Sequence, residues 1–163
     1  MASKSQIPYS HLLVSLVFFI FYVIVAELTP SRGWLWLKIV GLFLMPVAAV
    51  FIFYPFYLLR RHGKCQRGSS YLHTQEVVAN SLYSIVRQPQ YLGYILLVLG
   101  FMCIHQNWIC TVIGVTIVLS LYLQAKAEEE HCVRKFGDEY LSYMRRVPRF
   151  NVVLGIMRRI SRS

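Results

Sequence analysis

Four apolar runs separated by polar segments make up most of the chain. They cover residues 11–28, 34–59, 91–104 and 108–125. About 20 apolar residues cross the hydrocarbon core of a bilayer as a helix, so the pattern predicts four membrane-spanning helices. Only three polar residues, 105–107, separate the last two runs. Such a short connection predicts that these two helices form a tight antiparallel hairpin.

Two longer polar segments complete the pattern. Residues 60–90 form a polar loop between the second and third runs, and residues 126–163 form a charged tail. The tail has good helix formers as far as Tyr140, broken at Gly137, and is expected to become irregular near Pro148. The sequence therefore predicts an all-α polytopic membrane protein, residues 1–163 forming one integral membrane domain with a cytosolic, helical C-terminal segment.

Composition supports a membrane protein and excludes several other classes. Of the 163 residues, 56% are hydrophobic and only 15% are charged. This balance is not that of a disordered chain, a disulfide-stapled secreted module or an ordinary cytosolic enzyme. The first run could be a cleaved signal peptide, but it lacks a strongly basic leading segment and ends in Glu27-Leu28-Thr29-Pro30, which is a poor cleavage site. A retained span is the preferred interpretation.

The basic residues indicate an orientation. There are 17 Lys and Arg against 7 Asp and Glu, a formal net charge of +10. If the N-terminus is cytoplasmic, four spans place all basic residues except Arg32 and Lys38 on the cytoplasmic side, as the positive-inside rule requires. We therefore expect both termini to be cytoplasmic, in a bacterial inner membrane or the endoplasmic reticulum. The excess charge favours anionic lipid as partner rather than nucleic acid.

Polar groups that could support chemistry gather at the cytoplasmic ends of the predicted hairpin. One cluster is Tyr83–Tyr94, and the other is the run Glu128–Glu130. Because the hairpin is antiparallel, Arg87 should face the glutamates. A solvated helix end with an ion pair is the alternative interpretation. Carboxylates at a helix C-terminus oppose the helix dipole, which favours continuation of the helix beyond them.

The spacing of these residues resembles that of a known enzyme family. The pattern consists of Tyr83, Val86-Arg87-Gln88-Pro89, Tyr91, Gly93, Glu128-Glu129, Phe136-Gly137-Asp138-Glu139-Tyr140 and Tyr143-x-x-Arg146-Val147-Pro148-Arg149-Phe150. It resembles the isoprenylcysteine carboxyl methyltransferases, whose relatives include the phospholipid N-methyltransferases. The resemblance runs from Ser81 to Phe150. Gln88 stands where the family usually has His, and Ser81 where it usually has Gly.

The resemblance implies S-adenosylmethionine as methyl donor, held in a cytosol-facing pocket. The residues implied to contact it are Tyr83, Gln88, Pro89, Tyr91, Gly93, Tyr94, Glu128, Glu129 and Tyr140. Carboxylates suit the cationic groups or the ribose hydroxyls of this molecule. The tyrosines at 83, 91 and 94 can stack on adenine, or can instead form an aromatic belt at the membrane interface.

The resemblance also implies direct in-line methyl transfer, with Arg87 and Arg146 as catalytic residues that position an acceptor carboxylate. Arg149 is a less favoured candidate for the same task. The acceptor would be lipophilic or membrane-associated, most simply an isoprenylcysteine-like carboxylate. A phospholipid amine or a thiol is an alternative acceptor.

Other functions stay open at this stage. One alternative is a sterol-type membrane reductase, whose pattern is loosely similar at His131–Gly137. Another is a non-catalytic four-span scaffold, in which Gln88 would be a sign that an active site has been lost. The five histidines could suggest haem, but no two occupy facing mid-membrane positions in the predicted topology. The spacings of Cys and His do not close a metal site. Binding of S-adenosylmethionine separates the methyltransferase from the reductase and the scaffold.

Overall fold

The regular structure of the described chain is entirely helical. The computed structural model describes residues 9–29, 33–62 and 81–161. Its elements are α1 (Tyr9–Leu28), α2 (Leu35–His62), the 3-10 turn η1 (Ser81–Ser84), α3 (Pro89–His105), α4 (Trp108–Phe136), α5 (Asp138–Arg146) and α6 (Val152–Ile160). The predicted all-α class is confirmed for these residues. Positions 63–80 of the predicted polar loop lie outside the described residues.

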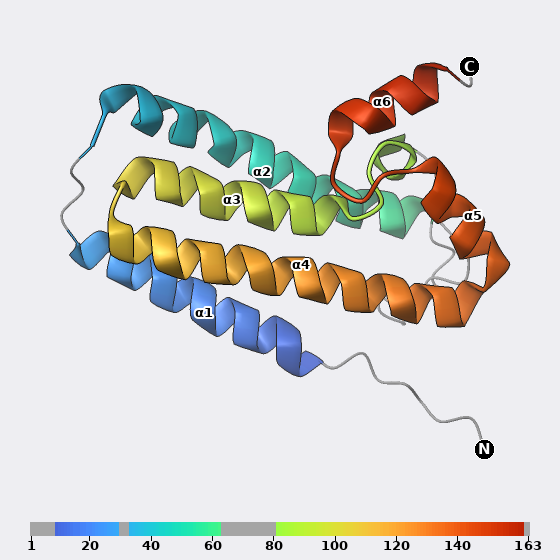
Figure 1. Ribbon diagram of the computed structural model, residues 1–163, viewed down its shortest axis with the longest axis horizontal. Helices are drawn as coiled ribbons and strands as arrows, with labels where there is room; N and C mark the ends of the chain where they lie inside the picture. Colours follow the sequence, from blue (N-terminus) through green and yellow to red (C-terminus); the bar gives the residue numbers. More distant parts are fainter. Residues whose placement is uncertain (1–8, 30–32, 63–80, 162–163) are drawn as a thin grey trace.

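The four long helices lie side by side along the molecule, as Figure 1 shows. Helix α2 packs most extensively on α3, α3 also packs on α4, and α4 packs on α1. Helices α3 and α4 run in opposite directions, joined by Gln106 and Asn107. The core between α1, α3 and α4 is formed by buried side chains, namely Tyr22, Ala26, Val98, Cys110, Ile117 and Leu121.

The surface of the long helices is that of an integral membrane protein. The Leu35–Pro55 segment of α2 and helix α4 are long and apolar enough to cross a bilayer, yet only 17% and 28% of their most apolar stretches are buried. A core helix of a soluble protein would hide such a face, whereas here Phe43 and Phe53 are both 69% exposed. Lipid is the solvent that suits this surface. The apolar parts of α1 and α3, Val17–Leu28 and Pro89–His105, are shorter.

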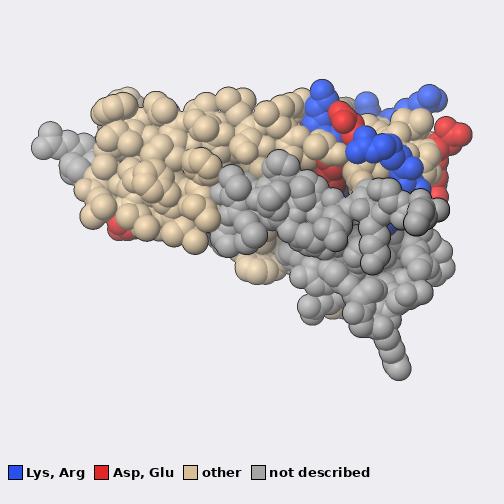
Figure 2. All heavy atoms as spheres, turned by 90° about the horizontal axis from the view of Figure 1, so that it is seen from below, with Lys and Arg blue, Asp and Glu red and all other residues tan. Residues whose placement is uncertain are grey.

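Charge is distributed unevenly along the long axis. On the face shown in Figure 2, the Lys and Arg side chains gather at one end of the molecule, and most of the remaining described surface is uncharged. This charged end is formed by the C-terminal part of α4, by α5 and α6, and by the connections that hold Arg87 and Arg149. The arrangement thus places the charged side chains at one end of an apolar helix bundle.

At the opposite end of the bundle, the Gln106 side chain joins the connection between α3 and α4 to the connection that precedes α2. We call this contact the Gln106 clamp. The amide of Gln106 accepts a hydrogen bond from the Trp34 backbone N–H at 2.8 Å and donates one to the Trp34 carbonyl at 3.0 Å. The backbone of Gln106 is in the left-handed conformation, with φ of 46°. The Asn107 side chain caps α4 by accepting a hydrogen bond from the Ile109 N–H at 2.9 Å. The sequence pattern suggested a three-residue turn, but His105 belongs to α3, so the turn has two residues.

Replacing Gln106 by alanine should lower the free energy of unfolding by about 1–2 kcal/mol, since two hydrogen bonds are lost. The change would appear as a lower thermal midpoint of the detergent-purified protein. Thr116→Val is the matched control, because the Thr116 hydroxyl bonds the Val112 carbonyl of its own helix. Equal midpoints for the two variants would show that the clamp does not join the connections.

The helical tail predicted as far as Tyr140, with a break at Gly137, is confirmed, and only the chain after Pro148 is more regular than its sequence suggested. Helix α4 continues to Phe136, well past residue 125 where the predicted span ends. Gly137 then adopts φ of 56°, a left-handed conformation that glycine tolerates, and α5 begins at once. A further helix, α6, follows Pro148 where irregular chain was expected.

Candidate active site

A buried carboxylate lies at the centre of the charged end. Glu129 of α4 is only 2% exposed. Its Oε1 and Oε2 accept hydrogen bonds from Nε and Nη2 of Arg149, at 3.0 and 2.7 Å. Its Oε1 also lies 3.2 Å from Nη2 of Arg87. Burial of a carboxylate is costly unless it is paired, and these two guanidinium groups supply the compensation. The predicted proximity of Arg87 to the Glu128–Glu130 run is confirmed.

Backbone pairing brings the two arginines together. The Arg87 N–H donates to the Pro148 carbonyl at 3.0 Å, and the Gln88 N–H donates to the Arg149 carbonyl at 3.3 Å. These bonds join the connection that precedes α3 to the connection that follows α5. Pro89 is the first residue of α3, where its missing N–H has no cost. The side chains of Arg87 and Arg149 therefore approach Glu129 from two distant parts of the sequence.

Helix α5 also holds the connection that precedes α3. Nη1 of Arg87 donates to the Met144 carbonyl at 2.8 Å, and the Tyr143 hydroxyl donates to the Tyr83 carbonyl at 2.7 Å. Burial raises the pKa of the Tyr143 hydroxyl above its ordinary value, so it remains a donor. Nε of Arg87 is buried and has no hydrogen-bond partner among the residues that the structure describes. This donor is thus available to a ligand or a water molecule.

Arg149 also contacts aromatic side chains. Its guanidinium carbon lies 5.2 Å from the ring centre of Tyr122, and the Tyr122 ring lies 6.3 Å from that of Phe150. The hydrogen bond to Glu129 raises the pKa of Arg149 above its ordinary value, so its charge is permanent. A cation over an aromatic face adds about 0.5–1 kcal/mol at a partly exposed site. Arg149 thus links the buried carboxylate to the exposed side of α4.

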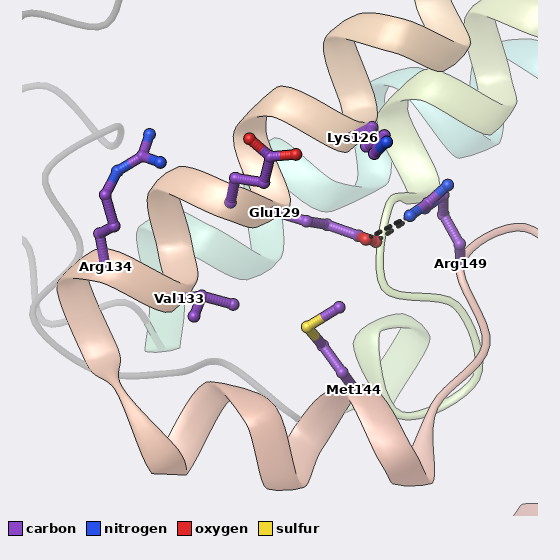
Figure 3. Close-up of a pocket in the computed structure, with 7 residues that line it drawn as sticks. Lys126, Glu129, Val133, Arg134, Met144 and Arg149 are labelled. Atoms are coloured by element: carbon purple, nitrogen blue, oxygen red, sulfur yellow. Dashed lines mark hydrogen bonds and ion pairs between the residues drawn. The ribbon is translucent and has the colours of Figure 1, made fainter.

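A cavity opens beside this ion-pair cluster, between α4 and α5 (Figure 3). Its volume is about 330 Å³, within the range of about 300–1,000 Å³ typical of small-molecule sites. The lining residues are Lys126, Glu129, Glu130, Val133, Arg134, Met144 and Arg149. Charges of both signs line it, which suits a ligand that itself carries both signs.

The predicted cofactor contacts are distributed around this cavity rather than gathered within it. Of that set, Glu129 is among the lining residues. Gln88 is buried at the N-cap of α3, where its side chain makes no capping hydrogen bond. Tyr83 is half-buried in η1, and burial raises the pKa of its hydroxyl. Tyr140 is buried against Tyr143 and Val147.

The predicted contacts on α3 face other helices. The Tyr91 hydroxyl lies near the Glu128 carboxylate of α4 and interacts with it electrostatically. Tyr91 and Tyr94 both pack, partly buried, against the core between α1, α3 and α4. A Cβ atom on Gly93 would lie 2.8 Å from Cγ1 and 2.9 Å from the backbone nitrogen of Ile52 in α2. The absence of a side chain at Gly93 is therefore explained by helix packing.

Arg146 does not join the cluster in this structure. It is exposed on α5, and its guanidinium donates to the carbonyl and hydroxyl of Ser142, one turn earlier, at 3.2 and 3.3 Å. The less favoured candidate, Arg149, instead makes the two-bond contact with Glu129. The chain turns out of α5 at Val147, and this change of direction aims Arg149 at the site.

Glu129 was predicted and Arg149 was a less favoured candidate, but the other lining residues were not predicted, although a signal for several of them exists. Lys126, Glu129, Glu130 and Val133 have the spacing i, i+3, i+4, i+7, which places them on one face of a helix. Once α4 is known to continue to Phe136, that spacing predicts the cavity wall. Met144 and Arg149 have no comparable local signal, because Met144 is brought to the cavity by the packing of α5 on α4, and Arg149 by its bonds to Glu129, which is 20 residues earlier in the chain.

Comparison with known proteins identifies the family. The sequence profile of the phospholipid methyltransferase family matches residues 36–139. The chain belongs to this family. The matched region includes Arg87 and Glu129 but ends before Arg149, which lies in the connection after α5.

The chain is also similar to individual proteins. The protein-S-isoprenylcysteine O-methyltransferase of Schizosaccharomyces pombe is 28% identical over 99 residues, 55% of this chain and 42% of that protein. The proteins of the same name in Xenopus laevis and Homo sapiens are 27% and 28% identical, over 69% of this chain and 40% of each relative. The chain thus matches about two fifths of the length of these relatives. No solved structure matches it.

Proposed function

We propose that this protein transfers a methyl group from S-adenosylmethionine to the carboxylate of an isoprenylcysteine-like acceptor in the membrane. The observation that carries the proposal is the buried Glu129, held by Arg87 and Arg149 beside a cavity at the end of an apolar bundle. A site with this placement can receive a polar cofactor from water and a lipophilic acceptor from between the helices. The similarity to protein-S-isoprenylcysteine O-methyltransferases of Schizosaccharomyces pombe and Homo sapiens supports the same reaction.

The membrane arrangement is part of the proposal. We propose that α1, α2, α3 and α4 are four spans, the last two a hairpin, with the charged end and both termini cytoplasmic. The basic residues at that end support this orientation through the positive-inside rule. S-adenosylmethionine is a cytosolic metabolite, so an open cavity on that side would give it direct access.

The residues of the cavity fit the proposed cofactor. Glu129 and Glu130 can accept hydrogen bonds from the ammonium group or from ribose hydroxyls, while Lys126 and Arg134 can pair with its carboxylate. When bound, S-adenosylmethionine would supply a methyl group on a positively charged sulfur. The acceptor oxygen would bond to the methyl carbon as the carbon–sulfur bond breaks, and S-adenosylhomocysteine would leave. The remaining predicted contacts, at Tyr83, Gln88, Pro89, Tyr91, Gly93, Tyr94, Glu128 and Tyr140, stay predictions.

The residues around Glu129 can position an acceptor carboxylate. Arg149 is 22% exposed at the edge of the cavity, and the buried Nε of Arg87 has a free hydrogen-bonding position. Donors of this kind hold a carboxylate in a fixed orientation and replace its hydration. We therefore propose Arg87 and Arg149 as the positioning groups. Arg146 would need to leave Ser142 to take part.

Gln88 favours a carboxylate acceptor over an amine. A carboxylate is already ionised at neutral pH and can attack without losing a proton. The ammonium group of a phospholipid must first be deprotonated by a base. Gln88, in the position where relatives usually have His, cannot act as that base because an amide does not titrate. The substitution is thus compatible with ester formation and unfavourable for amine methylation.

Transfer of a radiolabelled methyl group tests the proposal on the full-length protein in nanodiscs. We expect saturable binding of S-adenosylhomocysteine by calorimetry, and label transfer to an S-farnesylcysteine derivative with a free carboxylate. Alkali should release that label as methanol, as it does from a methyl ester. The matched carboxamide should not be labelled.

Two results would contradict the proposed function. Folded protein that does not bind S-adenosylhomocysteine would exclude the methyltransferase. Alkali-stable label on phosphatidylethanolamine, without label on the farnesylcysteine carboxylate, would show that the acceptor is an amine.

A further inference from the structure

Helix α6 carries its apolar side chains on one stripe. Val153, Ile156, Met157 and Ile160 have the spacing i, i+3, i+4, i+7, so they lie on a common face. Their exposed fractions are 68%, 42%, 62% and 71%. A stripe of this kind normally packs on a protein core. Here it faces away from the rest of the described chain.

The opposite side of α6 contacts the protein. Gly155 is buried, and a Cβ atom at that position would overlap the Ile85 carbonyl oxygen in the connection before α3. Nη1 of Arg158 donates to the Arg145 carbonyl of α5 at 3.4 Å. Figure 1 shows α6 beside this connection, and α6 makes no extensive contact with another of the described helices. The apolar face of α6 is thus exposed and its opposite face contacts the protein, which is the reverse of the usual arrangement for a surface helix of a soluble protein.

The positive charge around α6 indicates which kind of surface the apolar stripe can bind. From Tyr140 to the last residue, Ser163, the chain contains no acidic residue. It contains six arginines in that stretch, namely Arg145, Arg146, Arg149, Arg158, Arg159 and Arg162. An exposed apolar stripe flanked by arginines complements a bilayer surface that carries anionic headgroups. A second copy of this chain would bring the same positive charge and would be repelled.

We propose that α6 lies in the interfacial layer of an anionic membrane, with its apolar stripe among the acyl chains and with Arg158 and Arg159 at the headgroup phosphates. The helix begins just after Phe150, and Asn151 caps it by accepting from the Leu154 N–H at 2.9 Å. Lipid contact through α6 therefore anchors the connection that carries Arg149. The lipid contact itself does not depend on the proposed methyl transfer.

Hydrogen–deuterium exchange of the full-length protein tests this contact. Peptides covering residues 152–160 should exchange more slowly in nanodiscs of phosphatidylcholine mixed with phosphatidylglycerol than in phosphatidylcholine alone. The double substitution Val153→Ser, Met157→Ser should remove protection in both. The double substitution Arg158→Gln, Arg159→Gln should remove the dependence on phosphatidylglycerol, with docking weakened about fivefold for each arginine. Lys38→Gln, in α2, is the matched control, because Lys38 belongs neither to α6 nor to the cavity, and it should behave as the parent protein.

Two outcomes would overturn the proposal. Exchange of α6 at the same rate in detergent and in both bilayers would show that no lipid covers the stripe. Protection that appears in detergent and grows with protein concentration would show that a second copy covers it. Unchanged exchange in α3 peptides verifies that each variant is folded, so that a local loss of protection is not confused with unfolding.

Discussion

Replacing Glu129 by glutamine is expected to abolish binding of S-adenosylhomocysteine and to lower the free energy of unfolding by about 3–5 kcal/mol. The reason is that Arg87 and Arg149 both direct guanidinium nitrogens at this carboxylate, at 3.2 and 2.7 Å. Without its charge, two partly buried cations face each other with no counter-ion. Calorimetric titration of the purified protein measures the binding, and chemical denaturation measures the stability.

Stability and binding can be separated by two further variants. Glu130→Gln is the matched control, because Glu130 lines the same cavity but is exposed, so its effect on stability should be within about 0.5 kcal/mol. The double variant Glu129→Gln, Arg149→Gln removes one of the repelling cations and should recover part of the stability, but not the binding. Equal loss of stability from Glu129→Gln and Glu130→Gln would contradict the assignment of Glu129 as the centre of the ion-pair cluster.

The local sequence pattern was sufficient to predict the long helices and the proximity of Arg87 to the Glu128–Glu130 run. Apolar runs mark helices that face lipid or core, and the short Gln106–Asn107 connection limits α3 and α4 to being antiparallel neighbours. In contrast, the change from apolar to charged residues after residue 125 marks the expected edge of the membrane, not the end of the helix. Helix α4 continues to Phe136 because good helix formers follow, and only Gly137 interrupts them.

The role of Arg149 could not be predicted from local pattern. Its position depends on backbone hydrogen bonds between Arg87 and Pro148 and between Gln88 and Arg149, which join segments far apart in the sequence. Arg146 has the more familiar sequence context, yet the end of α5 leaves it on an exposed face. Spacing along the chain identified the correct segment, whereas only the three-dimensional pairing shows which arginine reaches the carboxylate.

Helix α6 was missed although its sequence contains the usual signals. Asn151 is a favourable N-cap residue, and an apolar stripe at i, i+3, i+4, i+7 follows it. The proline at position 148 suggested irregular chain, but Pro148 precedes the helix and contributes its carbonyl to the Arg87 N–H. A proline before an N-cap residue ends one helix and leaves the next free to begin.

The substitution Gly93→Ala is expected to lower the free energy of unfolding by about 1–3 kcal/mol. The new Cβ would lie 2.8 Å from Cγ1 and 2.9 Å from the backbone nitrogen of Ile52, and a backbone atom cannot move without displacing α2. In a bilayer there is little hydrophobic force between helices, so close packing at small residues holds α2 on α3. Thermal unfolding of the protein in nanodiscs measures the effect.

Gly114→Ala is the matched control for this prediction, since it adds the same methyl group within a neighbouring helix. The nearest atom to a Cβ at Gly114 is Sδ of Met102, at 2.6 Å, and this flexible side chain can move aside. We therefore expect Gly114→Ala to be near neutral, because the gain in helix propensity of about 1 kcal/mol offsets the local shift. A cofactor contact at Gly93, as the family resemblance implies, would give a different result. It would weaken binding of S-adenosylhomocysteine to folded protein while leaving stability at the level of the Gly114→Ala control, so the two measurements together decide whether Gly93 serves packing or binding.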